Sequence, residues 1–192
     1  MSPKTSSIVN YFSKRKPITD DEIYFLDSVF TEKKYSKNEI VVKKNQVCND
    51  IFFIDRGVLK TYFIDENNKE AINGIAIDNN FCTSVSSFVN QTPSSEIIEA
   101  LEDTILITIS FSDFKELINR YPVYKDIYVK ILEDYLTFMT WRIESVMLMD
   151  SVERYKTLMK IFPKLFLRVS NHDIAKYLGM SPETLSRIKS KR

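Results

Sequence analysis

The sequence is poor in the residues on which most catalytic and metal sites depend. Its 192 residues include three glycines, two cysteines and one histidine. With so few glycines, neither the dinucleotide-binding pattern GxGxxG nor the phosphate-binding loop GxxxxGK(S/T) occurs. The cysteine and histidine counts exclude four-cysteine and histidine-rich metal sites, and no GxSxG motif is present. We therefore expect no enzymatic activity, no metal and no resident cofactor.

Long apolar runs are also missing. The N-terminus has no apolar core of the kind found in secretory signal peptides. The longest uncharged stretch, residues 79–95, is too rich in Ser, Thr, Asn and Gln to cross a membrane. A composition that is 44% hydrophobic and 28% charged is enough for a buried core without disulfides. These features predict a cytoplasmic protein that does not bind membranes.

The net charge of +1 conceals an uneven distribution. Residues 1–150 carry 17 Lys or Arg against 23 Asp or Glu, whereas residues 151–192 carry ten against three. A basic segment that follows an acidic body is typical of polyanion binding, although a solvated lysine-rich face gives the same count. The charge pattern therefore needs a second, independent signal.

The N-terminal half is predicted to be mostly β-structure. After a short helix that begins at the capping box Thr19–Glu22, several segments rich in β-branched and aromatic residues alternate with turns. The predicted strands are residues 39–43, 51–54, 58–64, 70–77, 95–100 and 104–109. Many short strands at this spacing predict an antiparallel sandwich or barrel.

A long helix is predicted over residues 123–149, after a shorter one capped by Ser110. Apolar residues cover most of its circumference, so it must be buried on more than one side. One side can pack on the β-domain, and a second copy of the helix is the simplest cover for the other. Burial within a monomer is the alternative. We assign dimerisation to the stripe Ile131, Tyr135, Phe138 and Arg142, while the other apolar positions are Val129, Leu132, Leu136, Met139, Ile143 and Val146.

Residues 170–190 have the pattern of two short helices joined by a tight turn. Ser170 is a favourable N-cap, with Asp173 at the third helical position. Gly179 can adopt the positive φ that ends a helix, and Ser181 followed by Pro182 is a typical start for the next. The inward positions of both helices are apolar: Ile174, Ala175, Leu178, Leu185 and Ile188. This pattern predicts a helix-turn-helix, although a plain helical hairpin is the alternative.

The second of these helices carries side chains suited to DNA. Arg187 can bind guanine through two parallel hydrogen bonds, and Glu183 can accept one from cytosine. Its hydroxyls and lysines can contact bases or phosphates. The candidate DNA-binding residues are Ser181, Pro182, Glu183, Thr184, Ser186, Arg187, Lys189 and Lys191.

A predicted β-domain, a long apolar helix and the segment IAKYLGMSPETLSRI together resemble the Crp/Fnr family, which includes the bacterial cyclic-AMP receptor protein. IFFIDRGVLK, residues 51–60, resembles the strand–Gly–strand signature of that family. The resemblance implies an α+β fold: a double-stranded β-helix (jelly roll) with flanking helices over residues 1–122, a dimerisation helix over 123–150, and a winged-helix-like helix-turn-helix over 151–192. It also implies a homodimeric regulator of transcription that binds double-stranded DNA, with RNA polymerase as a further partner.

The sequence departs from the family at two places. Cyclic-nucleotide binders carry a Gly-Glu pair and later an Arg that neutralises the phosphate, but here Thr83-Ser84 and Ser94-Ser95 stand at those positions. We therefore expect no cyclic-AMP binding of the family type, and these four residues are the candidate pocket for an unknown small-molecule effector. A polar loop without a pocket is the alternative. The chain also ends soon after the recognition helix, without the family's β-hairpin wing, and a truncated sequence would look the same.

Two other functions compete with the regulator hypothesis. One is a ligand-sensing or protein-interaction module that has lost DNA binding, which the missing wing and the altered nucleotide-binding residues favour. The other is a cupin-like enzyme on the jelly roll, which lacks the usual ligands because no histidine occurs in residues 1–171.

Overall fold

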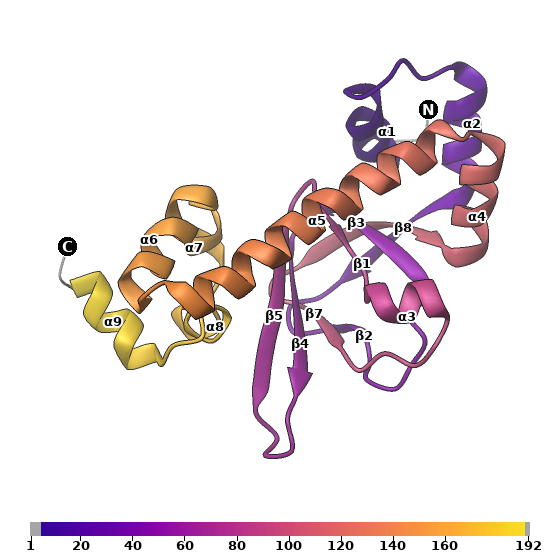
Figure 1. Ribbon diagram of the computed structural model, residues 1–192. Helices are drawn as coiled ribbons and strands as arrows, with labels where there is room; N and C mark the ends of the chain where they lie inside the picture. The colour runs from indigo at the N-terminus through magenta and orange to yellow at the C-terminus, as the bar shows by residue number, and fades with distance from the viewer. Residues whose placement is uncertain (1–4, 191–192) are drawn as a thin grey trace. The chain divides into compact units, whose positions relative to one another are not determined.

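The computed structural model describes residues 5–190 of the chain, and Figure 1 shows its helices and strands. Their bounds are α1 Ser6–Ser13, α2 Asp20–Val29, β1 Phe30–Tyr35, β2 Ile40–Val42, β3 Asp50–Arg56, β4 Val58–Ile64, β5 Glu70–Ile77, β6 Phe81–Cys82, α3 Val85–Asn90, β7 Ile97–Ala100, β8 Thr104–Ser110, α4 Phe111–Arg120, α5 Val123–Leu148, α6 Ser151–Ile161, α7 Leu165–Arg168, α8 Asn171–Tyr177 and α9 Pro182–Ser190.

The chain divides into two units. Among the described residues, the first unit comprises 5–63 and 74–125, and we call it the jelly-roll unit. The second comprises 64–73 and 126–190, and we call it the helical unit. The helical unit therefore contains the tip of the β4–β5 hairpin as well as most of α5 and all of α6 to α9.

The jelly-roll unit is built from antiparallel strands in two four-stranded sheets. One sheet has the order β1-β8-β3-β6 and the other β2-β7-β4-β5. Strand β8 pairs along its length with β1, from Phe30 opposite Ile109 to Tyr35 opposite Thr104, and on its other side with β3. The predicted α+β class and jelly-roll fold are confirmed.

The core of this unit lies between the sheets. Its centre consists of fully buried side chains from four strands: Phe52, Ile54, Leu59, Ile98, Ala100 and Leu106. Burying an aliphatic side chain of this size stabilises the fold by about 1.5–3 kcal/mol. The β-branched segments found in the sequence form these strands because alternate residues can then enter one shared core.

Two strands of this unit, β1 and β6, and two helices, α1 and α3, were not predicted. Phe30 directly follows helix α2 and begins β1, where it pairs with Ile109. Strand β1 reads Phe-Thr-Glu-Lys-Lys-Tyr, so its charged centre hides the β-pattern, while β6 is two residues long. Helix α3 lies in the Ser- and Asn-rich stretch that sequence analysis treated as a loop.

Local capping signals located the helix starts well. The Thr19–Glu22 capping box is formed, and Ser110 accepts a hydrogen bond from the Asp113 N–H. Helix α5 runs unbroken through 26 residues, as Figure 1 shows. Asp150 then accepts hydrogen bonds from the first turn of α6. In the described part of the chain, no helix combines the length and apolar character needed to cross a membrane.

Candidate DNA-binding surface

Helices α8 and α9 form the predicted helix-turn-helix. Ser170 caps α8 by accepting a hydrogen bond from the Asp173 N–H at 3.1 Å. Ser181 does the same for α9, accepting from the Thr184 N–H at 3.2 Å. Because each cap satisfies a backbone donor at a helix start, the short helices begin at defined residues.

Gly179 forms the turn between these helices. Its φ is +64°, a left-handed conformation in which a side chain would be strained. Its N–H bonds to the Lys176 carbonyl at 3.1 Å, and the Met180 N–H bonds to that of Ala175 at 3.0 Å. The turn thus satisfies carbonyls at the end of α8 and redirects the chain into α9.

The inner faces of the two helices are buried. Ile174 and Ala175 of α8 and Leu185 of α9 have no exposed surface, and Leu158 of α6 is equally buried. The small side chain of Ala175 allows the helices to approach closely. This packing gives α9 a fixed face for solvent.

The predicted DNA-binding residues lie along that solvent face. Thr184 is half-buried, and the other described members of the set are exposed: Ser181, Pro182, Glu183, Ser186, Arg187 and Lys189. Lys191 lies outside the described residues. The arrangement can present hydrogen-bond donors and acceptors to a DNA groove without unfolding any part of the core.

Hydrogen bonds within α9 hold its polar side chains in place. Arg187 Nη2 donates to Thr184 Oγ1 at 3.2 Å, and that hydroxyl lies 3.2 Å from Ser181 Oγ. A hydrogen bond from Ser181 lowers the pKa of Glu183, with smaller contributions from the backbone and from the charges of Arg187 and His172. The Glu183 carboxylate is therefore a hydrogen-bond acceptor at neutral pH. The nearby Arg187 is a donor, and its hydrogen bond to Thr184 fixes the direction of its guanidinium.

A contact that sequence analysis missed joins the two helices. Lys189 Nζ donates to Asn171 Oδ1 at 2.8 Å, which places the end of α9 beside the first turn of α8. Asn171 follows the cap residue Ser170, and this position at a helix start is the only signal in the sequence. Both side chains are exposed, so both can contact a phosphate beside the groove.

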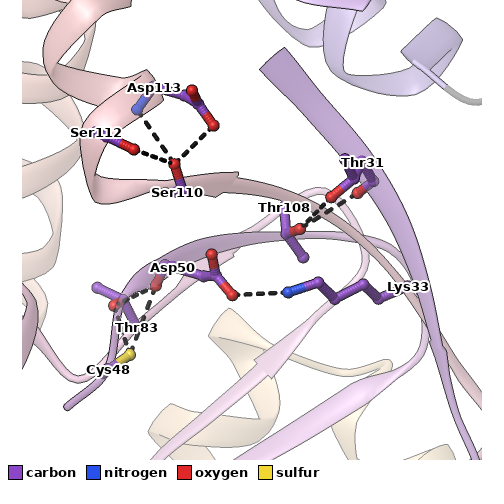
Figure 2. Close-up of polar contacts among 9 residues, drawn as sticks. All are labelled: Thr31, Lys33, Cys48, Asp50, Thr83, Thr108, Ser110, Ser112 and Asp113. Carbon is purple, nitrogen blue, oxygen red and sulfur yellow. Dashed lines mark hydrogen bonds and ion pairs between the residues drawn. The ribbon is translucent and has the colours of Figure 1, made fainter. Parts of the chain in front are cut away.

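The four candidate effector residues of the jelly-roll unit do not share one surface. Ser84 and Ser94 are buried and their hydroxyls lie 2.9 Å apart, while Ser95 is exposed. Ser94 Oγ also accepts from the Glu96 N–H at 3.0 Å. Thr83 donates to the Asp50 carbonyl at 2.9 Å, as Figure 2 shows. Three of the four hydroxyls are thus bonded to the chain itself.

Cys82, one of the two cysteines, lies in β6. Burial raises its pKa to about 12, so the group remains a protonated thiol at neutral pH. Since the thiolate is the reactive form, this environment is that of a packing residue. Within the described residues, no group of His, Cys, Asp and Glu side chains is arranged to hold a metal ion.

Two of the four residues assigned to dimerisation, Arg142 and Phe138, make contacts within the helical unit. Arg142 donates hydrogen bonds to carbonyls of the hairpin tip and of α8, and Phe138 packs edge-on against Phe162 with ring centroids 5.4 Å apart. Ile131 is half-buried, and Tyr135 is 44% exposed. These four residues therefore do not form one exposed face of α5.

The exposed apolar stripe on α5 consists of the other positions. Leu136, Ile143 and Val146 are more than half exposed, and Val129 is 44% exposed. Leu132 and Met139 lie between them and are half-buried. Counted along the chain, the six residues are spaced alternately by three and four, which is the a/d repeat of a coiled coil.

Two family models match separate parts of the chain. Residues 32–121 match the model of the cyclic nucleotide-binding domain, and residues 167–190 match that of the bacterial regulatory proteins of the crp family. Together the matches cover most of the jelly-roll unit and the whole helix-turn-helix.

Similar proteins agree with these matches. The anaerobic regulatory protein of Haemophilus influenzae is 23% identical, over 89% of this chain and 70% of its own length, and that of Pasteurella multocida is 22% identical, over 89% and 66%. The solved structure of FixK2 from Bradyrhizobium japonicum superposes with a TM-score of 0.75 at 18% identity, covering 85% of this chain and 84% of that one. CooA from Carboxydothermus hydrogenoformans gives 0.70 at 18%, covering 100% and 84%. The chain belongs to the Crp/Fnr family of regulators and carries its DNA-binding helix-turn-helix.

Proposed function

We propose that the protein is a homodimeric regulator of transcription that binds a two-fold-symmetric DNA site through α9. The observation that carries this proposal is the exposed face of α9. There Arg187 is held by Thr184, Glu183 is kept ionised, and the helix stands on a buried core. A recognition helix needs this combination of a rigid base and free polar side chains.

The chemistry of this face predicts what it recognises. A guanidinium can donate two parallel hydrogen bonds to O6 and N7 of guanine, and a carboxylate can accept one from N4 of cytosine. Arg187 and Glu183 are separated by one helical turn, so they can reach neighbouring base pairs. We therefore expect a half-site in which G·C pairs occupy the positions facing these residues.

The exposed stripe of α5 supports the dimer. Val129, Leu136 and Ile143 occupy a positions, and a parallel copy of the helix would bury them together with Leu132, Met139 and Val146. An apolar stripe of this length is seldom left in contact with water. The substitution Ile143→Glu places a charge in this seam and should convert the dimer to a monomer, as measured by light scattering. Lys130→Gln, on an exposed part of the same helix, should leave the dimer intact.

We further propose that cyclic AMP is not the effector. By the resemblance to the family, Ser94 takes the place of the phosphate-binding arginine and Ser84 that of the glutamate. The two buried hydroxyls bond to each other, and neither supplies positive charge. An anionic phosphate there would lack its strongest partner. Calorimetry should detect no binding of cyclic AMP at micromolar concentration, and a clear binding isotherm would refute this part of the proposal.

Selection of duplexes from a random DNA library tests the main proposal. Wild-type protein should enrich a two-fold-symmetric sequence, and Arg187→Ala should lose that enrichment while keeping its fold and its dimeric mass. Failure of the wild type to enrich any sequence, with salt-independent or absent binding, would instead indicate a sensing or interaction module.

A further inference from the structure

The tip of the β4–β5 hairpin belongs to the helical unit, where it meets Arg142 of α5. Arg142 donates a hydrogen bond from Nη1 to the carbonyl of Asn73, and Nη2 lies 3.4 Å from that of Ile72. Nη2 also donates to the carbonyl of Tyr177 in α8 at 3.1 Å. One guanidinium thus joins the hairpin tip, the long helix and the first helix of the helix-turn-helix.

The aromatic ring of Tyr177 adds to this contact. The guanidinium of Arg142 stands 4.1 Å from the ring centroid, in the geometry of a cation–π interaction. Tyr177 is 4% exposed, and burial raises its pKa to about 12, so the phenol is neutral at all physiological pH values. The planar guanidinium is therefore held both by its edge and by its face.

A second arginine binds the carbonyl of Leu178, which follows Tyr177 at the end of α8. Arg154 of α6 donates from Nε to the carbonyl of Leu178 at 2.9 Å and from Nη1 to that of Met149 at 2.7 Å. The last carbonyls of a helix have no partner within it and carry partial negative charge, so cations are favourable there. We call Arg142 and Arg154 with these acceptors the arginine bridge.

An ion pair lies beside the arginine bridge. Lys176 Nζ of α8 is 3.0 Å from Glu70 Oε2 in the hairpin tip, and both side chains are about 30% exposed. A pair with this exposure contributes little stability by itself. Its position supplies a second link between the hairpin tip and α8, next to the turn at Gly179.

We propose that Arg142 is a positioning residue for DNA binding, which acts with Arg154 and the Glu70–Lys176 pair to fix α8 against the hairpin tip. Because α8 and α9 pack against each other and their side chains Ile174 and Leu185 are completely buried, the placement of α8 determines that of α9. The arginine bridge is thus a second support for the recognition helix, on the end of α8 away from its cap. This inference rests on the DNA-binding function proposed above.

The chemistry of the bridge requires arginine specifically. Its guanidinium has several donors in a rigid plane, which lets it serve carbonyls of two segments and stack on a ring at once. A lysine keeps the charge but offers a single ammonium group. Arg142→Lys therefore separates the geometry of the bridge from its charge.

The test compares Arg142→Gln and Arg142→Lys with the wild type in four measurements. Both variants should bind the duplex selected by the wild type about tenfold more weakly. Binding to an unselected duplex of equal length and the dimeric mass should stay within twofold of the wild type. Amide hydrogen exchange should become faster in residues 70–73 and 176–179 together, because one group holds both segments.

Lys130→Gln is the matched control, since it removes one positive charge from the same helix without touching the bridge. It should leave all four measurements unchanged. If Arg142→Gln folds poorly, Glu70→Gln provides a milder variant, with a smaller loss of affinity and the same paired increase in exchange.

Two results would overturn the inference. One is selected-duplex binding within twofold of the wild type in both Arg142 variants. The other is loss of the dimer with unchanged exchange at the hairpin, which would return Arg142 to the dimerisation role expected from the sequence. If the wild-type protein selects no duplex, the proposed DNA-binding function itself is wrong. Failure of the proposed function can therefore be distinguished from failure of the inference about Arg142.

Discussion

Polar side chains of the jelly-roll unit and of the helical unit look alike in the sequence but behave differently in the structure. In the jelly-roll unit Ser84 and Ser94 are buried, and their hydroxyls bond to each other at 2.9 Å. On α9 the polar side chains turn outward, and Ser186 is exposed together with Glu183 and Arg187. Serine therefore stabilises a loop in one unit and lies on the surface in the other. Exposure, rather than composition, separates the two roles.

The largest effect should come from truncating the core beneath the recognition helix. Ile174→Ala removes a completely buried side chain and should destabilise the helical unit by about 2–5 kcal/mol. Urea denaturation followed by circular dichroism measures this loss, and DNA binding should fall with it. Ile98→Ala makes the same truncation in the jelly-roll core. Equal loss of DNA binding from Ile98→Ala, at conditions where the protein is still folded, would contradict the separation of the two units' roles.

Removing the exposed guanidinium of Arg187 should lower the affinity for DNA and leave the free energy of unfolding unchanged. Arg187→Ala should weaken binding to the selected duplex by about 1–3 kcal/mol and relax the preference for guanine at one position of each half-site. Fluorescence anisotropy on duplexes that vary at that position measures both effects. A uniform loss on every sequence would show that Arg187 contacts phosphate instead of a base.

Substitution in the buried Ser84–Ser94 pair should give the opposite result, a loss of stability with no change in DNA affinity. Ser94→Ala removes the partner of Ser84 Oγ and the acceptor of the Glu96 N–H, so it should cost about 1 kcal/mol of unfolding free energy. DNA affinity should be unchanged. Ser95→Ala, at the exposed neighbour, should alter neither quantity. If Ser94→Ala left stability intact but changed DNA binding, the loop would be a functional site.

The smallest effect should come from the contact between α8 and α9. Lys189→Gln removes one candidate phosphate contact, so it should weaken binding similarly on all sequences and reduce the slope of log affinity against log salt by about one. Titrations at several salt concentrations measure the slope. A change confined to the selected duplex would mean that Lys189 contributes to base recognition.

Much of the helical unit was accessible from the sequence because its signals are local. Ser170 with Asp173, Gly179, and Ser181 with Pro182 each act within four residues, so the boundaries of α8 and α9 could be predicted. The jelly-roll strands with continuous apolar runs were equally clear. Strand β1 was not clear, because its charged residues hide the β-pattern. They lie in a strand only through pairing with β8, more than 70 residues away in the chain.

The faces of α5 illustrate what sequence periodicity leaves open. Two apolar stripes run along this helix, and both were visible in the sequence. The sequence could not tell which stripe is engaged inside the chain. Arg142 and Phe138 are engaged by α8, the hairpin tip and Phe162, which leaves the stripe from Val129 to Val146 exposed.

The sequence by itself determined the starts of the helices capped by Thr19, Ser110, Ser170 and Ser181, the turn at Gly179, the strand-rich first half and the family to which the chain belongs. These properties depend on caps, backbone conformation and apolar periodicity, which act over a few residues. Only the tertiary structure decided that Ser84 and Ser94 satisfy each other, that Arg142 bridges the hairpin tip to α8, and which stripe of α5 faces solvent. Those outcomes depend on contacts between segments far apart in the chain, where a polar side chain binds whichever donor or acceptor the fold brings to it.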